Sequence, residues 1–271
     1  MNKDNNSIIE KVFKDLRKNN KKAFIPFITC GFPSMEGFLE LFRVLDGSGA
    51  DIIEVGIPFS DPLADGPVIQ ETSRIALENG INTDIVFKYL LRARHISKKP
   101  IAIMTYFNTI YRYGVERFLK KSREAGVNGI IVPDLPLEEF KKYFKHFKEA
   151  NIDNIMFASL TSSRERLMTV ARKSKGFIYC ISVKGVTGVR NNVNPEIIDF
   201  LKGMRGITKL PLALGFGLSN REQVSQIKDY CDGIIMGSKI LSLVLEEDDF
   251  KDGIKAVESF ASKINKILKT S

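Results

Sequence analysis

The chain repeats one pattern eight times, and this repetition constrains its fold more than any single residue does. In each repeat, a short run rich in Val, Ile and Phe is followed by a stretch with helical periodicity. The runs are AFIPFIT, DIIEVG, PIAIMTY, VNGIIVP, NIMFASL, FIYCISV, LPLALGF and DGIIMGS. Strands that alternate with helices predict a parallel sheet in an α/β protein. Eight such runs favour a closed (β/α)8 TIM barrel over an open sheet, with an extra amphipathic helix before it at Ser7–Asn19.

The size of the chain agrees with a single domain. Its 271 residues suit one α/β barrel, which typically has about 250, and neither a linker nor a low-complexity tract divides them. We therefore expect one domain over residues 1–271. No apolar run is long enough to cross a membrane, and the N-terminal residues lack the apolar core and cleavage site of a secretory signal. These features predict a cytoplasmic protein without a membrane partner.

Charge and reactive residue types argue against several classes of function. The net charge is +9, but the lysines alternate with acids in helical stretches such as EEFKKYFKHFKEA, so we expect solvated helix faces and no nucleic-acid partner. Three cysteines, Cys30, Cys180 and Cys231, lie far apart beside apolar runs, which is typical of reduced core thiols. The two histidines, His95 and His146, lie in lysine-rich helical segments. The sequence therefore predicts neither a metal site nor a histidine-based triad.

The segment EVGIPFSDPLADGP, residues 54–67, places acidic residues at the end of a core strand. In a barrel the chemistry lies at the carboxyl ends of the strands. Because side chains alternate along a strand, Glu54 and Gly56 share one face, and the aliphatic residues of the other face pack against the helices. Glu54 should therefore point into the barrel, where burial raises the pKa of its carboxyl group and suits it to proton transfer. The alternative is an ion pair with a buried Lys or Arg, but the neighbouring runs contain no such residue.

Asp65 has two interpretations that the residues alone leave open. It directly precedes Gly66, Pro67 and a helix-like stretch, so its carboxylate could cap that helix. The prolines at positions 58, 62 and 67 restrict the loop, however, and would hold a carboxylate in a fixed place for catalysis.

Glycines gather at the ends of the last three runs. GVTG (185–188) follows the sixth run, GFG (215–217) ends the seventh, and Gly237–Ser238 ends the eighth before the helix-like GSKILSLVLEE. Glycines let backbone N–H groups approach an anion closely, and barrels often bind phosphate with these loops and a helix N-terminus. We therefore predict a phosphate-ester ligand. Aromatic residues at the ends of runs either pack in the core or line a pocket for a flat apolar group: Phe27, Tyr106, Tyr179 and Phe216.

Several of these segments together resemble the tryptophan synthase alpha subunit family. They are PFITCGFP, EVGIPFSDPLADGPVIQ, VPDLP, GVTG and GFG, and they follow the family's order through nearly the whole barrel. The resemblance implies a lyase that cleaves indole-3-glycerol phosphate to indole and glyceraldehyde 3-phosphate in L-tryptophan biosynthesis. It also implies an alpha2beta2 assembly with a beta subunit that carries pyridoxal phosphate and receives the indole, while this chain needs no cofactor.

The resemblance also assigns roles to individual residues. The catalytic residues would be Glu54 and Asp65. The substrate-binding residues would be Phe27, Tyr106, Tyr179, Thr187, Gly188, Phe216, Gly217, Gly237 and Ser238. The chain departs from some members of the family at Phe32, where an aspartate helps to hold the mobile loop, and at Val183–Lys184, where an arginine precedes a small residue. Both differences bear on how the loop at 184–192 closes.

Two loops at the barrel mouth form an expected docking surface for the beta subunit. PFSDPL brings Asp61 and Pro62 next to the catalytic loop, and YFNTIYRYG presents Asn108, Ile110 and Tyr111. Apolar groups at a rim with few charges suit the core of an interface.

Three alternatives remain open on the sequence. One is a Schiff-base aldolase that uses Lys184, although that lysine lies in a loop where its pKa should stay near normal. Another is a stand-alone lyase of the same family that releases indole without a beta partner. The third is a barrel that binds a phosphate ester without turning it over.

Overall fold

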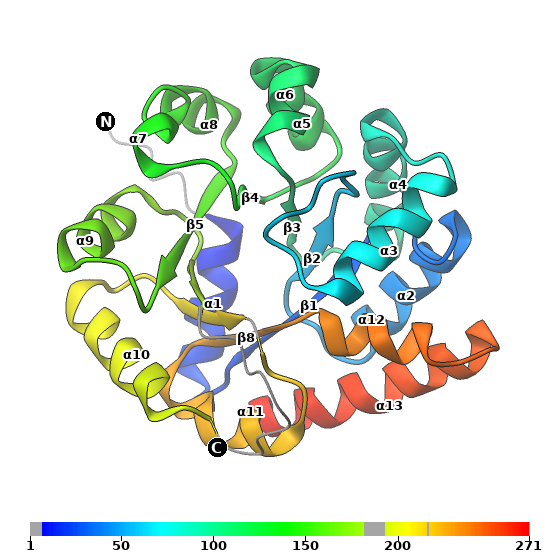
Figure 1. The fold of residues 1–271 in the computed structure, drawn as a ribbon. Coiled ribbons are helices and arrows are strands. Elements are labelled where there is room, and N and C mark those ends of the chain that lie inside the picture. Colours follow the sequence, from blue (N-terminus) through cyan, green and yellow to red (C-terminus); the bar gives the residue numbers. More distant parts are fainter. Residues whose placement is uncertain (1–6, 182–192, 216, 271) are drawn as a thin grey trace.

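The structure is a computed structural model, and it describes residues 7–181, 193–215 and 217–270. Eight strands within these residues form a closed barrel in which each strand is parallel to both of its neighbours, in the order β1 to β8 (Figure 1). The strands are β1 (Ala23–Thr29), β2 (Ile53–Gly56), β3 (Ile101–Met104), β4 (Gly129–Ile131), β5 (Asp153–Ser159), β6 (Ile178–Ile181), β7 (Leu212–Gly215) and β8 (Gly233–Met236). The predicted (β/α)8 barrel and all eight strand runs are confirmed.

Helices surround the barrel on its outer side (Figure 1). They are α1 (Ile8–Lys18), α2 (Met35–Gly47), α3 (Pro67–Glu78), α4 (Thr83–Ile96), α5 (Phe107–Tyr113), α6 (Val115–Glu124), α7 (Leu137–Phe140), α8 (Phe144–Ala150), α9 (Arg164–Lys173), α10 (Pro195–Ile207), α11 (Arg221–Ile227), the 3-10 turn η1 (Lys228–Tyr230), α12 (Ser238–Leu245) and α13 (Phe250–Lys269). Polar side chains cap many of their N-termini; Ser34 and Asn82, for example, each accept a hydrogen bond from a backbone N–H of the first turn. Gly49 and Gly126, which follow α2 and α6, have positive φ angles of 92° and 78°, the conformation in which glycine commonly ends a helix.

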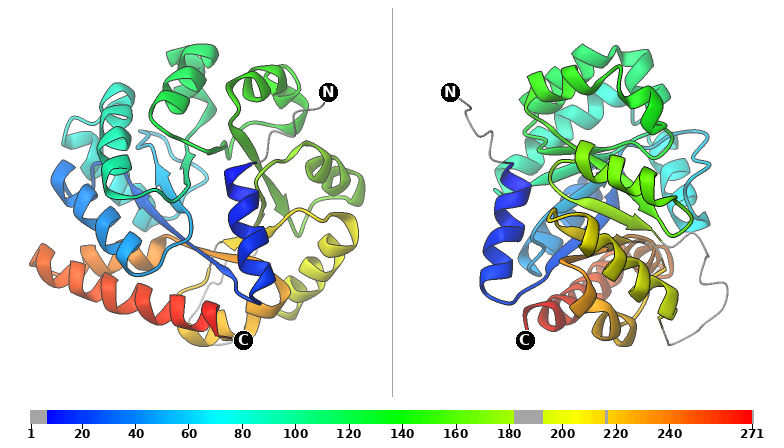
Figure 2. Two further views of the ribbon diagram at one scale, coloured as in Figure 1. Left: turned by 180° about the vertical axis from the view of Figure 1, so that it is seen from behind. Right: turned by 90° about the vertical axis from the view of Figure 1, so that its left-hand side faces the viewer.

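The extra N-terminal helix, α1, covers the amino end of the barrel. Figure 2 shows it lying across that end when the molecule is seen from behind. Its buried residues are Ile9 and Phe13. A methyl group added to Gly129 would come 2.9 Å from Ile9 Cδ1, and one added to Gly233 would come 3.1 Å from Phe13 Cε1. The helix therefore packs directly on the first residues of the strands and closes this end of the barrel to solvent.

Buried or partly buried aspartates at the amino end all have partners. Asp51 accepts hydrogen bonds from the Phe24 backbone N–H and the Lys269 ammonium group. Asp232 accepts from the Leu212 backbone N–H and pairs with Arg205 and Arg17. Burial would raise the pKa of its carboxyl group, but the bond from Leu212, followed by the two arginines, holds it below its usual value.

Asp153 lies at the same end and accepts a hydrogen bond from the Ser7 hydroxyl, the N-cap of α1. Burial raises the pKa of Asp153 to about 6 despite this bond. The carboxylate therefore ties α1 to the start of β5.

Two further expectations about the described chain can be compared with the structure. Cys30, Cys180 and Cys231 are all buried and free, as predicted for core thiols. No described helix combines the length and apolar character needed to cross a membrane.

Candidate active site

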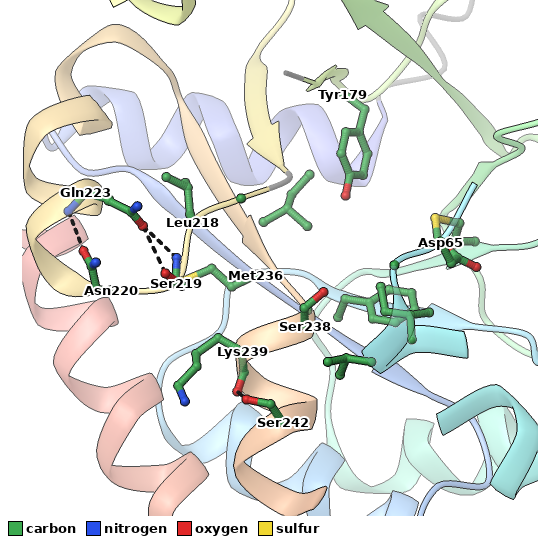
Figure 3. A pocket seen from close by; sticks show the side chains of 18 of the residues that line it. Asp65, Tyr179, Leu218, Ser219, Asn220, Gln223, Met236, Ser238, Lys239 and Ser242 are labelled. Atoms are coloured by element: carbon green, nitrogen blue, oxygen red, sulfur yellow. Dashed lines mark hydrogen bonds between the residues drawn. The ribbon is translucent and has the colours of Figure 1, made fainter. Parts of the chain in front are cut away.

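A cavity of about 620 Å³ opens at the carboxyl ends of the strands. Strand ends, the loop before α3, the loop after β7 and the first turns of α12 supply its walls (Figure 3). The lining residues are Phe27, Asp65, Gly66, Val68, Ile69, Met104, Tyr179, Gly217, Leu218, Ser219, Asn220, Gln223, Ile235, Met236, Gly237, Ser238, Lys239, Ser242 and Glu246. Around the barrel axis the wall is apolar and aromatic, and toward α11 and α12 it is polar. The cavity can therefore take a ligand with a flat apolar part and a polar or charged part.

Glu54 lies inside the barrel, as the alternation of side chains predicted. Its strand neighbours in register are Phe27 on β1 and Ala102 on β3, and Phe27 lines the cavity on the same face. The side chain is 0% exposed, and neither carboxyl oxygen has a hydrogen-bond partner among the described residues. Burial, followed by the nearby charge of Asp65, raises the pKa of Glu54 to about 8. The predicted alternative of an ion pair with a buried Lys or Arg is absent from the described residues.

Asp65 lies on the cavity wall and is held there by Tyr106. The Tyr106 hydroxyl donates to Asp65 Oδ2 at 3.1 Å and accepts from the Ala64 backbone N–H at 2.9 Å. The N-cap of α3 is Gly66, and it makes no side-chain capping bond, so the structure gives no support to a capping role for Asp65. Burial raises the pKa of Asp65 to about 6, although the bond from Tyr106 lowers it.

The two carboxyl groups therefore differ in how readily they ionise. The pKa of Glu54 is raised to about 8 and that of Asp65 only to about 6, so Glu54 is the acid and Asp65 the anion favoured near neutral pH. Tyr179 lies close enough to both carboxyl groups for their charges to raise the pKa of its hydroxyl further above the usual range, although burial is the larger cause. One acid and one fixed anion at the same end of the barrel can divide the work of a proton-transfer reaction.

Glycines at the strand ends make room for two aromatic rings of the cavity wall. A methyl group on Gly56 would come 2.5 Å from Phe27 Cζ, and one on Gly237 would come 3.0 Å from Phe27 Cδ1. A methyl group on Gly215 would come 2.4 Å from Tyr179 Cε1. Phe27 and Tyr179 can therefore lie against the strand backbone, which leaves the centre of the cavity free for a ligand.

The predicted phosphate-binding residues fall partly within the described chain. Gly217, Gly237 and Ser238 line the cavity together, and Ser238 begins α12. In Figure 3, Asp65 lies on the opposite side of the cavity from Leu218, Ser219 and Asn220. Thr187, Gly188 and Phe216, like Val183 and Lys184, lie outside the described residues.

Other predicted residues lie at or behind the rim. Tyr106 is absent from the cavity lining, because its hydroxyl binds the Asp65 loop and its ring stacks on Phe59 with 5.0 Å between the centroids. Asp61 and Asn108 are exposed and Pro62 is partly buried, so all three can be reached by a partner. Ile110 was expected at this rim, and that expectation is wrong: it is 1% exposed and packs in the core. Leu63, which was not singled out from the sequence, is 93% exposed in the same loop.

The polar wall of the cavity was not anticipated from the sequence. Asn220 caps α11 and Gln223 accepts hydrogen bonds from Ser219, while Lys239 and Glu246 come from α12 and the residue after it. The helix-like stretch GSKILSLVLEE gave a signal for α12, but the direction of Lys239 depends on where the helix meets the barrel. Over the described ranges, no group of three His, Cys, Asp or Glu side chains could hold a metal ion.

The fold and the site together define a (β/α)8 enzyme with acid–base groups at the mouth of its barrel. The comparisons with known proteins then identify the family. The profile described as "Tryptophan synthase alpha chain" matches residues 13–269, and the chain belongs to this family.

Individual relatives agree over nearly the full length. The tryptophan synthase alpha chain of Trichormus variabilis is 42% identical over 260 residues, which cover 96% of this chain and 97% of that protein. That of Thermoanaerobacter sp. is 38% identical, with 96% and 99% covered. Among solved structures, tryptophan synthase subunit alpha from Legionella pneumophila has a TM-score of 0.90 at 32% identity, with 97% and 98% covered. A Mycobacterium tuberculosis tryptophan synthase chain has a TM-score of 0.89 at 30% identity, with 97% and 98% covered.

Proposed function

We propose that this cavity cleaves indole-3-glycerol phosphate into indole and glyceraldehyde 3-phosphate, with Glu54 as the proton-transfer group and Asp65 as a fixed anion. Membership of the tryptophan synthase alpha chain family makes the protein a lyase of L-tryptophan biosynthesis. The observation that carries the residue assignment is the fully buried Glu54 carboxyl group, which has no hydrogen-bond partner among the described residues and whose pKa burial raises to about 8. Burying an unpaired carboxyl group costs stability, and groups of this kind are concentrated at functional sites. Its position at the carboxyl end of the barrel therefore favours a role in catalysis.

The proposed reaction needs an electron sink, and the indole ring supplies it. The Glu54 carboxylic acid gives its proton to C3 of the indole ring, which leaves a positive charge on the ring nitrogen. The Asp65 carboxylate stabilises that charge. The C3–C1′ bond of the glycerol chain then breaks, its electron pair returns to the ring, and the C1′ hydroxyl becomes the aldehyde as it loses its proton. The Glu54 carboxylate can take up that proton, so the enzyme ends in the protonation state in which it began.

Glu54 must move before this step. It is fully buried and lies behind the cavity wall beside Phe27, so its carboxyl group has to rotate toward the cavity to reach C3. Catalytic contacts that form only in the substrate complex are common in enzymes.

The test is indole release from indole-3-glycerol phosphate by the wild-type chain and by Glu54→Gln. Glutamine has nearly the same size but cannot transfer the proton, so turnover should fall by roughly 10²–10⁴, the usual contribution of general acid–base catalysis. Retention of more than a tenth of the wild-type rate would refute the role of Glu54. Absence of turnover in the wild type, with a beta subunit present, would instead favour the barrel that binds a phosphate ester without reaction.

The partner and the setting extend the same proposal. A tryptophan synthase beta subunit with pyridoxal phosphate would dock on Asp61, Pro62 and Asn108, with the exposed Leu63 at the centre, in an alpha2beta2 assembly. We propose that residues 1–271 form one domain in the cytoplasm, that this chain itself holds no cofactor, and that neither nucleic acid nor membrane is a partner. Addition of a beta subunit should raise indole release if this is right, whereas full activity of the isolated chain would favour the stand-alone lyase.

The Schiff-base aldolase is tested separately. Borohydride treatment with substrate would modify Lys184 only in a Schiff-base aldolase.

A further inference from the structure

The described wall of the cavity carries a charge that does not favour a phosphate ester. Its charged residues are Asp65, Lys239 and Glu246, so one cation stands against two carboxylates. A phosphate group brings nearly two further negative charges at neutral pH, as phosphate esters do with a second pKa of about 6. The backbone N–H groups at the start of α12 supply only about half a positive charge. A cation beside the phosphate would offset this charge, and Lys239 is the one that the described residues of the wall offer.

Lys239 lies next to the predicted phosphate-binding residues. It is the second residue of α12, directly after Ser238, and it lines the same cavity as Gly217 and Gly237. Its side chain points away from Ser238 (Figure 3). Its Nζ lies 3.6 Å from Glu246 Oε2, which is too long for a good hydrogen bond. The exposed fractions of the two side chains, 30% and 61%, also mean that water screens the pair.

We propose that Lys239 is a substrate-binding residue whose ammonium group leaves Glu246 and pairs with the phosphate of the substrate. Glu246 then acts against binding, because it competes for the same ammonium group and repels the phosphate. The four-carbon stem of lysine allows the change by side-chain rotation alone. A pair with a doubly charged phosphate is stronger than the screened pair with Glu246. This inference rests on the proposed function, which supplies the phosphorylated substrate.

The contacts of the Lys239 side chain contribute little to the stability of the fold. The backbone carbonyl of Lys239 accepts a hydrogen bond from the Ser242 hydroxyl, and this bond survives any substitution of the lysine side chain. The pair with Glu246 is long and exposed, so its loss should hardly change stability. Substitutions at Lys239 and Glu246 therefore report on binding.

The first measurement is calorimetric binding of glycerol 3-phosphate, which has the phosphate of the substrate but no indole, to the full chain. Lys239→Gln should raise the Kd roughly tenfold, as expected for a lost charge-assisted bond. Lys239→Arg should stay near the wild type. Glu246→Gln should lower the Kd about two- to fivefold, and this gain should shrink when Lys239→Gln is also present. Lys263→Gln is the matched control, because it removes the same charge from an exposed position of α13 outside the cavity.

The second measurement is the turnover of indole-3-glycerol phosphate. Lys239→Gln should raise KM in parallel with the Kd and leave kcat nearly unchanged, since the lysine meets the phosphate in both the substrate and the transition state. A Kd and KM of Lys239→Gln within twofold of the wild type, with normal turnover, would overturn the role of Lys239 while the proposed function stands. Wild-type binding of glycerol 3-phosphate without any indole release would instead contradict the proposed function.

Discussion

The two ends of this barrel keep buried carboxyl groups in opposite conditions. At the amino end, Asp51, Asp153 and Asp232 each accept hydrogen bonds from groups on other elements. At the carboxyl end, Glu54 is more deeply buried than any of these and has no hydrogen-bond partner among the described residues. Acids of the first kind hold elements together, whereas an unpaired acid costs stability and stays available to a ligand. The difference separates the end that stabilises the fold from the end proposed to carry the chemistry.

A raised pKa alone does not make this distinction. Asp153 at the amino end and Asp65 at the carboxyl end both titrate at about 6 because both are buried. Asp153 is bound to Ser7 beneath α1, whereas Asp65 faces a cavity that can hold a ligand. The surroundings of each group, and not its pKa, indicate what it can do.

After Glu54→Gln, the largest expected effect is the loss of turnover in Asp65→Asn. Asparagine keeps the shape and a bond to Tyr106 but loses the charge that would stabilise the cationic ring. We expect kcat to fall by roughly 10²–10³, the usual effect of removing one electrostatic stabiliser, with the Kd for glycerol 3-phosphate unchanged. Weakened binding with normal turnover would indicate that Asp65 only supports its loop.

The second effect concerns stability and its dependence on pH. The folded-state pKa of Glu54, about 8, lies above its usual value of 4.5, so the folded protein binds more protons than the unfolded chain between these pH values. Stability from this group is present below pH 4.5 and is lost as the pH rises toward 8. Glu54→Gln removes that loss, which amounts to on the order of 3 kcal/mol at pH 7 by linkage. Urea unfolding at pH 5 and pH 8 measures the free energy of unfolding of Glu54→Gln and of the wild type. The variant should exceed the wild type by more at pH 8 than at pH 5. An equal difference at both pH values would show that Glu54 does not titrate between them.

Asp232→Asn should change the pH dependence of stability in the opposite direction from Glu54→Gln, and by a smaller amount. Its partners lower the folded-state pKa, so its contribution to stability is present above the usual pKa of an aspartate and is lost as the pH falls through the lowered value. The variant should unfold with about 1–2 kcal/mol less free energy at pH 7, because Arg17 and Arg205 lose a charged partner but remain partly solvated. Turnover per folded molecule should not change. A loss of turnover without a loss of stability would break the contrast between the two ends.

The smallest effect is expected for Tyr106→Phe. The lost hydroxyl bond lowers the pKa of Asp65 in the wild type, so its removal should move the acid limb of the pH–rate profile upward, by less than one pH unit. Turnover at neutral pH should fall severalfold, since the Asp65 loop also loses the bond from Ala64 to this hydroxyl. Tyr111→Phe, assayed like Tyr106→Phe in the isolated chain, serves as the control, because Tyr111 is a nearby tyrosine that is 65% exposed. An unchanged acid limb would show that Tyr106 does not position Asp65.

Local patterns predicted the barrel well, and the site only in part. The alternation of side chains along EVG was enough to place Glu54 inside, because the period of a strand is a local property. The role of Asp65 depended on Tyr106, which lies 41 residues further along the chain, and no local pattern joins the two.

Contacts between the first and last strands of the barrel could not be predicted from local sequence either. Gly237 makes room for the Phe27 ring because β8 pairs with β1, the two strands furthest apart in the sequence. Gly217 was predicted as a phosphate-binding glycine, but its φ of 83° would strain any other residue, so substitution there cannot test phosphate binding. Ile110 was misplaced at the rim because helical periodicity in a seven-residue helix does not show which face meets the barrel.

The most direct test of the account is the titration of the Glu54 carboxyl group itself. Carbon-13 NMR of the glutamate side chains in the full wild-type chain, with Glu54→Gln used to assign the resonance, measures its pKa without substrate. The account predicts a midpoint near 8 that moves to lower pH in Asp65→Asn, because the charge of Asp65 contributes to the shift. A midpoint close to 4.5, unchanged by Asp65→Asn, would contradict the claim that the carboxyl end of the barrel holds a protonated acid ready for transfer.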